Sequence, residues 1–174
     1  MRYYIIRQVE GHTNAPLFGN LHSVMDVRMI DRHRYRKLPE RIPVKISENP
    51  YAIFPGTIIY PILLFSEETW QAVKVYLPFL PDRQIILIDA ANNSTKIYHL
   101  PILEKIYCLS DKSITNRDRS VLKNAVLKKE AIEDEVLFQI GEMRSRCTVV
   151  RLDLLESILF RDYTGIALQK VNVE

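Results

Sequence analysis

The segment from Ile58 to Leu77 constrains the fold more than any other part of the chain. Residues 58–65 are almost wholly apolar, as in a buried strand, and they run directly into Ser66-Glu67-Glu68-Thr69. A serine oxygen can accept hydrogen bonds from the free amides of a helix start, and acidic residues there complement the helix dipole. We therefore predict a strand followed at once by a helix whose N-cap is Ser66.

The helix predicted after Ser66 should be about three turns long. Apolar side chains recur at Trp70, Val73 and Leu77, so the helix has one face to bury. Pro78 disfavours helical geometry in the residue before it, and the helix should end there.

Strand patterns recur along the rest of the chain. Alternation in residues 41–47 predicts a half-buried strand, and Pro43, which cannot donate to a ladder, places it at a sheet edge. Further strands are predicted over residues 2–9, 84–89, 96–100, 104–109, 136–140, 145–150 and 166–171, with two hairpins among them. Helices are predicted around residues 121–126 and 154–159, and Gly165 suits a left-handed position after the second. The expected class is α+β, with mixed or antiparallel sheets and two or three short amphipathic helices.

Prolines and one glycine punctuate residues 50–61, which is the candidate seam between two lobes. We expect residues 1–57 to form a strand-rich lobe and residues 58–174 to form an α+β domain, the two making one compact unit. The oligomeric state stays open, because proline-blocked edges occur in monomers and in dimers.

The composition is typical of a globular protein, with 174 residues, 47% hydrophobic and 26% charged. Two cysteines exclude a disulfide framework. No apolar run approaches the roughly 20 residues of a membrane span, and the amino terminus lacks the apolar stretch of a secretory signal. We therefore expect a cytoplasmic protein that has no membrane partner.

Positive charge is concentrated in the first third of the chain. Residues 1–60 hold 9 Lys and Arg against 5 Asp and Glu, whereas residues 61–174 hold 15 against 16. Six of these cations lie between Arg28 and Arg41, with Tyr35 among them. Such a segment can contact phosphates or an acidic protein face, or it can be a solvated edge that discourages aggregation.

The residue patterns of common catalytic and metal sites are missing. His12, His22, His33 and His99 are not at the spacing that places two imidazoles on one helix face, so no metal site is expected. Cys108 and Cys147 lie in apolar strand patterns typical of core residues. Five glycines form none of the phosphate-binding or nucleophile motifs, so we expect no cofactor.

Candidate acid pairs are also weak. Asp153 and Glu156 share a predicted helix face, but both should be exposed, whereas acid–base catalysis needs environments that separate two pKa values. We predict that the protein is not an enzyme. A dispersed site built from Tyr98, His99 and nearby acids is the enzymatic alternative.

Four segments nevertheless resemble a known family. They are the strand and capped helix of residues 58–70, the strand pair of residues 83–100, residues 109–120, and residues 152–159 with Tyr163-Thr164-Gly165-Ile166-Ala167-Leu168. In this order they are similar to the bacterial polymorphic-toxin immunity proteins of the group called immunity protein family eleven. The likeness covers about two thirds of the chain, mainly after residue 50. Arg151 departs from it, because the family usually has a serine or threonine cap before the last helix.

The resemblance implies a non-enzymatic protein that binds a cognate toxin and neutralises it. The basic segment is outside the family pattern, so a role for Arg32, Arg34, Tyr35 and Arg36 in binding an acidic toxin depends on their charge alone. The alternative is a nucleic-acid-binding module that uses residues 28–41. A net charge of only +3 and the many acids after residue 60 argue against that alternative.

Overall fold

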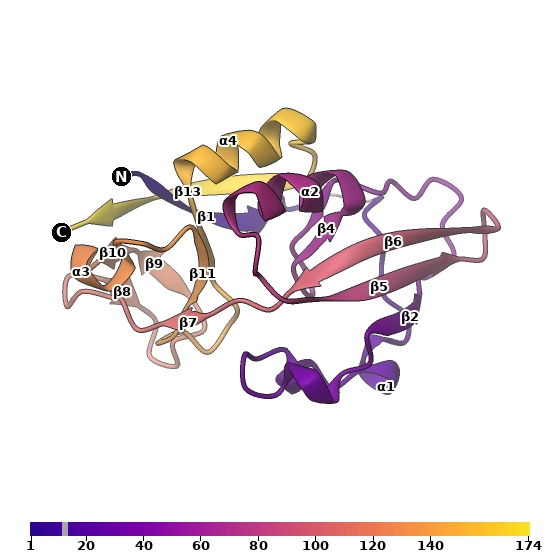
Figure 1. The fold of residues 1–174 in the computed structure, drawn as a ribbon, viewed down its shortest axis with the longest axis horizontal. Coiled ribbons are helices and arrows are strands. Elements are labelled where there is room, and N and C mark those ends of the chain that lie inside the picture. Colours follow the sequence, from indigo (N-terminus) through magenta and orange to yellow (C-terminus); the bar gives the residue numbers. More distant parts are fainter. Residues whose placement is uncertain (12–13) are drawn as a thin grey trace. The chain divides into compact units, whose positions relative to one another are not determined.

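A computed structural model of the chain describes residues 1–11 and 14–174 (Figure 1). Strands hold 35% of the chain and helices 20%, in mixed and antiparallel sheets, so the fold class is α+β, as predicted. Contacts divide the chain into two compact units. Unit 1 comprises Met1–Arg7, Leu103–Ser157 and Ala167–Glu174, and unit 2 comprises Gln8–Ile102 and Ile158–Ile166.

Unit 2 is built on a five-stranded sheet with the order β2-β5-β6-β4-β3. The strands are β2 Arg41–Lys45, β3 Thr57–Ile58, β4 Leu64–Ser66, β5 Asp82–Asp89 and β6 Ser94–Pro101. The long hairpin of β5 and β6 confirms the predicted strand pair. Strand β2 lies at the sheet edge, as Pro43 predicts, and runs parallel to β5.

One face of this sheet is covered by chain that precedes it. Helix α1 Leu21–Val24 and the 3-10 helices η1 Val27–Met29 and η2 Tyr35–Lys37 contribute to this cover. Alternate residues of the strands, including Val44, Leu87 and Tyr98, form a buried core with Leu21 and Leu38. Because strand side chains alternate between faces, the residues between them point to the opposite side.

That opposite side carries helix α2 Glu67–Tyr76, which contacts β4 and β6 (Figure 1). The predicted N-cap is confirmed, since the Ser66 hydroxyl accepts a hydrogen bond from the Thr69 amide at 3.3 Å. The helix ends at Tyr76, before Pro78. Its buried face includes Trp70 and Val73, as the spacing predicts.

Unit 1 holds a six-stranded sheet with the order β10-β13-β1-β12-β11-β7. Its strands are β1 Tyr3–Gln8, β7 Lys105–Ile106, β10 Val126–Leu127, β11 Leu137–Ile140, β12 Thr148–Arg151 and β13 Ile166–Val173. The antiparallel pair of β11 and β12 confirms the second predicted hairpin. The unit also contains the short helix α3 Lys129–Ile132.

Strand pairing across the sequence explains why the unit bounds differ from a division after residue 57. Strand β1 pairs with β12, about 145 residues later, whereas β2 pairs with β5. The first 57 residues therefore contribute to both sheets.

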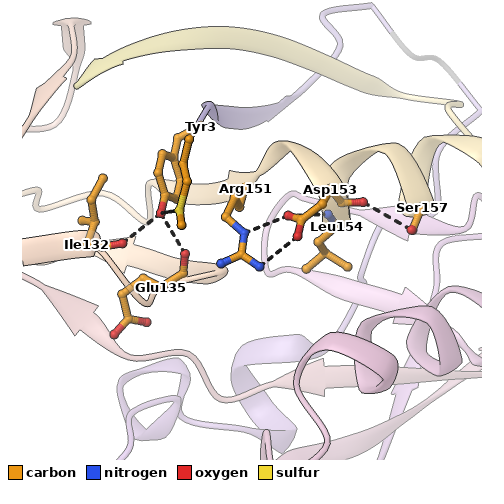
Figure 2. A network of polar contacts seen from close by, with 8 residues as sticks. Tyr3, Ile132, Glu135, Arg151, Asp153, Leu154 and Ser157 are labelled. Atoms are coloured by element: carbon orange, nitrogen blue, oxygen red, sulfur yellow. Dashed lines mark hydrogen bonds and ion pairs between the residues drawn. The ribbon is translucent and has the colours of Figure 1, made fainter. Parts of the chain in front are cut away.

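Helix α4 Leu152–Arg161 starts without a serine or threonine cap. Figure 2 shows the Arg151 guanidinium reaching the Asp153 carboxylate in two hydrogen bonds of 2.9 and 2.8 Å. The same carboxylate accepts from the Leu154 amide at 3.0 Å. Asp153 thus satisfies one of the amides that the missing cap leaves free. Beyond the helix, Gly165 has a φ of 77°, the left-handed conformation predicted for it.

The helix predicted around residues 121–126 is wrong. Strand β9 Leu122–Asn124 pairs with β8 Ile114–Thr115, and β10 follows it in the large sheet. The apolar spacing of Val121, Leu122 and Ala125 suits a helix, but pairing with β8 and with the distant strand β13 prevails over this local preference.

Candidate partner-binding site

The basic segment of unit 2 is a folded turn that leads into η2. Asp31 organises it: its carboxylate accepts from the His33 amide at 2.9 Å, and its carbonyl oxygen accepts from the Tyr35 amide at 2.9 Å. Arg32, His33 and Arg36 are exposed, whereas Tyr35 is half-buried. The cations therefore project from a backbone whose turn is closed by hydrogen bonds.

Tyr35 is the anchor of this segment. It packs against the core of unit 2, and the guanidinium carbon of Arg83 lies 4.9 Å from its ring centroid. Arg83 itself donates to the carbonyl oxygens of Leu38 and Asp82, at 3.2 and 3.0 Å. A guanidinium over an aromatic face adds an electrostatic attraction to the packing. The segment is thus tied to strand β5.

A surface hollow of about 480 Å³ lies beside this anchor. Its lining residues come from the basic segment and from the loop after α2, and are Arg32, His33, Tyr35, Arg36, Phe79 and Pro81. Three of the four residues singled out in the sequence therefore lie around one hollow. Arg34 is outside this lining, and its guanidinium is 3.9 Å from the Asp31 carboxylate.

Phe79 is the residue at this site that the sequence interpretation missed. Its side chain is 94% exposed, in a turn closed by the Leu80 amide donating to the Leu77 carbonyl oxygen at 3.1 Å. Pro78 and Pro81 flank it and restrict the backbone. The signal was the run Leu77-Pro78-Phe79-Leu80-Pro81, which indicates a helix end but does not indicate an exposed phenylalanine.

Part of the charge in residues 28–41 is compensated locally. Arg28 makes a bidentate contact with Asp26, and the hydrogen bonds from Arg28 lower the pKa of that carboxyl. Arg34 is paired with Asp31. Arg32 and Arg36 are the arginines of this segment that line the hollow.

His99 forms a second cluster in unit 2. The ring is buried, and its Nδ1 and Nε2 atoms lie 2.6 Å from carboxylate oxygens of Asp82 and Glu67, respectively. It stacks on Trp70 with ring centroids 5.3 Å apart, and Trp70 stacks in turn on Phe65. Tyr98 is on the opposite face, where its hydroxyl donates to the Pro55 carbonyl oxygen at 2.6 Å. Tyr98 and His99, which the enzymatic alternative combines, are not brought together.

The environment of His99 favours a charged ring. Burial opposes the charge and is the largest single influence, but hydrogen bonds to Asp82 and Glu67 outweigh it and raise the pKa of His99. The hydrogen bond to His99 lowers the pKa of Glu67. A protonated imidazole between two carboxylates has no nitrogen left to accept a proton from a substrate. In this geometry the ring of His99 joins the first turn of α2 to the sheet, through its contacts with Glu67 and Asp82.

The two cysteines lie in the core of unit 1, as predicted. Burial raises the pKa of the Cys108 thiol to about 12 and that of the Cys147 thiol to about 11. Because the thiolate is the nucleophile, neither side chain is activated.

Among residues 1–11 and 14–174, no group of His, Cys, Asp and Glu side chains could hold a metal ion. His12, one of the histidines considered in the sequence, lies outside the described residues. No helix in the described part of the chain has the length and apolar character needed to cross a membrane.

Comparison with models of protein families, with curated proteins and with solved structures found no match for this chain.

Proposed function

We propose that this chain is a non-enzymatic immunity-type protein that binds and neutralises a cognate bacterial toxin in the cytoplasm of the producing cell. The observation that carries the proposal is the hollow of unit 2, where Arg32 and Arg36 lie beside the exposed ring of Phe79. Arginine and aromatic side chains are enriched among the residues that dominate binding energy in protein interfaces.

The two kinds of side chain have different tasks in this proposal. Arg32 and Arg36 steer an acidic toxin surface during the encounter, which raises the association rate. Phe79 then buries its ring in the toxin and slows dissociation. The prolines around Phe79 and the Arg83 contact with Tyr35 hold the surface in shape, so little conformational entropy is lost on binding.

The test begins with a tagged chain in nuclease-treated lysate of its source organism. A protein retained in stoichiometric amount is then expressed alone and together with the chain. We expect expression alone to kill the cells and co-expression to restore growth. Retention of nothing by a folded chain, or of a protein whose toxicity the chain does not relieve, contradicts the proposal.

Variants assign the interface once the toxin is in hand. Phe79→Ala should weaken binding about tenfold or more through faster dissociation. Replacing Arg32, Arg34 and Arg36 by glutamate should slow association and reduce its dependence on salt. The matched control replaces three exposed cations of unit 1, Arg117, Lys123 and Lys170, by glutamate. Equal effects of the two triple variants would show that only net charge matters and would remove the hollow from the interface.

Nucleic-acid binding by residues 28–41 is the second candidate, and the exposed arginines around Tyr35 favour it. A binder that neutralises several phosphates loses affinity steeply with salt, with a logarithmic slope near −0.9 per contact on duplex DNA. The carboxylate partners of Arg28 and Arg34 reduce the charge available. Binding of duplex and single strands that is undetectable at low salt would eliminate this candidate.

A further inference from the structure

The five-stranded sheet of unit 2 carries helix α2 over only part of one face. The strand order is β2-β5-β6-β4-β3, and α2 packs on β4 and β6. An α-helix with its side chains is about 10–12 Å wide, whereas neighbouring strands lie about 4.8 Å apart. One helix therefore covers about two strands. On the face that carries α2, the adjacent strands β5 and β2 together have the width of one further helix.

Strand register places three apolar side chains in one row across this part of the sheet. Ile86 of β5 pairs with Pro43 of β2 and with Ile97 of β6. The residues before and after Ile86 on the strand, Ile85 and Leu87, belong to the buried core. Because side chains alternate along a strand, the row points away from that core.

The row is part of a larger surface, which we call the open face. It comprises Arg41, Pro43, Lys45, Ile86, Ile88 and Ile97. Its residues on β2 are exposed and Ile97 is 49% exposed, whereas those on the middle strand β5 are half-buried between their neighbours. Figure 1 shows the β5–β6 hairpin continuing past α2 toward its tip. Contiguous apolar patches that remain exposed mark protein interaction sites.

The polar side chains of the open face are cationic. Arg41 and Lys45 are exposed and lie on the same side of β2 as the apolar row. Their aliphatic stems can lie along apolar surface while the charged ends stay in water. Two carboxylates on the α2 side of the sheet, those of Asp82 and Glu67, contact His99. Charge complementarity at the open face therefore favours an acidic partner.

The backbone of β2 is poorly suited to pairing with an added strand. Pro43 has no amide hydrogen to donate. The Lys45 amide donates to the Asn20 side-chain oxygen at 2.8 Å, and the Lys45 carbonyl oxygen accepts from the Gly19 amide at 2.8 Å. A partner is therefore expected to pack on the side chains of the open face, as α2 packs on β4 and β6, and not to extend the sheet.

We propose that the open face binds an amphipathic helix of a partner protein, which presents an apolar stripe to Ile86 and Ile97 and acidic side chains to Arg41 and Lys45. Burial of the apolar row supplies most of the affinity, and the two cations favour acidic helices over basic ones. The residues that line the hollow at Phe79 are not part of the open face, so this inference does not depend on the proposed function.

The test titrates the full chain with a synthetic peptide of about 18 residues, long enough to form a helix. The peptide has leucines at alternating spacings of three and four residues and glutamates beside them. A second peptide has the same leucines with lysines in place of the glutamates. By calorimetry at low ionic strength, we expect saturable binding of the acidic peptide and binding of the basic peptide that is at least about tenfold weaker.

Variants of the chain assign the contact to the open face. Ile86→Thr combined with Ile97→Thr should weaken binding about tenfold or more, because threonine suits a strand but offers less apolar area. The matched control Leu168→Thr, at a strand position of unit 1 that is 44% exposed, should leave the affinity within about twofold. Arg41→Gln combined with Lys45→Gln changes only exposed side chains and should weaken binding about threefold or more, with a smaller dependence on salt.

Several results would overturn the proposal. They are no saturation with the acidic peptide at millimolar concentration, equal binding of the two peptides, and an equal loss in Leu168→Thr. A dimer of the chain alone in analytical ultracentrifugation that the double isoleucine variant abolishes would make a second copy the occupant. Tighter binding to anionic lipid vesicles than to the acidic peptide would make it a lipid surface.

Discussion

The two ten-residue helices are held in place by different physical means. Helix α2 has Trp70 stacked on His99, and Glu67 in its first turn contacts the ring of that histidine. Helix α4 instead buries aliphatic side chains, with Leu154, Leu155 and Ile158 at most 1% exposed. Packing of aliphatic groups does not depend on pH, whereas an ion pair does. We therefore expect the attachment of α2, unlike that of α4, to respond to pH.

The largest expected effect is on α4. Leu154→Ala removes a fully buried side chain and should destabilise the protein by about 2–5 kcal/mol, because the lost transfer energy is joined by the cost of a cavity. The loss, measured by denaturant unfolding, should be the same at pH 5.5 and pH 8. A pH-dependent loss would break the distinction between the two helices.

The next largest effect is on the attachment of α2 through His99. His99→Phe keeps an aromatic ring on Trp70 but removes the two hydrogen bonds to carboxylates, and should cost about 1–3 kcal/mol near pH 5.5. Ile97→Phe, on the same strand at a half-exposed position, is the control and should change the unfolding free energy by only a few tenths of a kcal/mol. Equal stability of the two variants would show that the two hydrogen bonds of His99 do not stabilise the attachment of α2.

The stability of the unmodified chain should also depend on pH, through His99 and Glu67. The folded pKa of His99 is raised, so its contribution is fully present below the ordinary value of 6.5 and is lost as pH rises through the folded pKa. The pKa of Glu67 is lowered, so its contribution is present above 4.5 and is lost as pH falls through the folded pKa. Together they predict greatest support for α2 between pH 4.5 and 6.5. Thermal unfolding at a series of pH values measures this dependence. The loss of stability on the alkaline side should disappear in His99→Phe.

Removing the side-chain acceptor at the start of either helix should have a smaller effect on stability, and the two costs can be compared. Ser66→Ala should cost about 1 kcal/mol, because the Thr69 amide loses its acceptor. Asp153→Ala should cost about 0.5–1 kcal/mol, since its pairing with Arg151 is partly exposed and the Leu154 amide loses an acceptor. Urea unfolding measures both. A cost for Asp153→Ala well above that for Ser66→Ala would show that the ion pair is the stronger cap.

The smallest expected effect on stability is at the proposed interface. Phe79→Ser changes a side chain that is 94% exposed and should leave the unfolding free energy within about 0.5 kcal/mol. The same change should weaken toxin binding as Phe79→Ala does. A large loss of stability would indicate that Phe79 supports the fold of unit 2.

Arginines of the candidate binding site could be predicted from the charge pattern of the sequence, but the shape of the hollow could not. The density of arginines singled out Arg32 and Arg36, which line the hollow. The same signal singled out Arg34, which lies outside the lining. Phe79 and Arg83 join the site only because the loop after α2 and strand β5 lie beside the basic segment, and no local pattern records that proximity.

Features that depend on a few neighbouring residues could be predicted from the sequence. The cap at Ser66 follows from its side-chain oxygen. Proline explains the end of α2 before Pro78 and the edge position of β2. The left-handed conformation of Gly165 follows from its missing Cβ. The strands Leu122–Asn124 and Val126–Leu127 and the contacts of His99 with Glu67 and Asp82 could not be predicted in this way. The contacts of His99 join residues 17 and 32 positions apart, and β10 pairs with the distant strand β13. They therefore depend on which strands pair when the chain closes, and that choice is made by burial and hydrogen bonding over each whole unit.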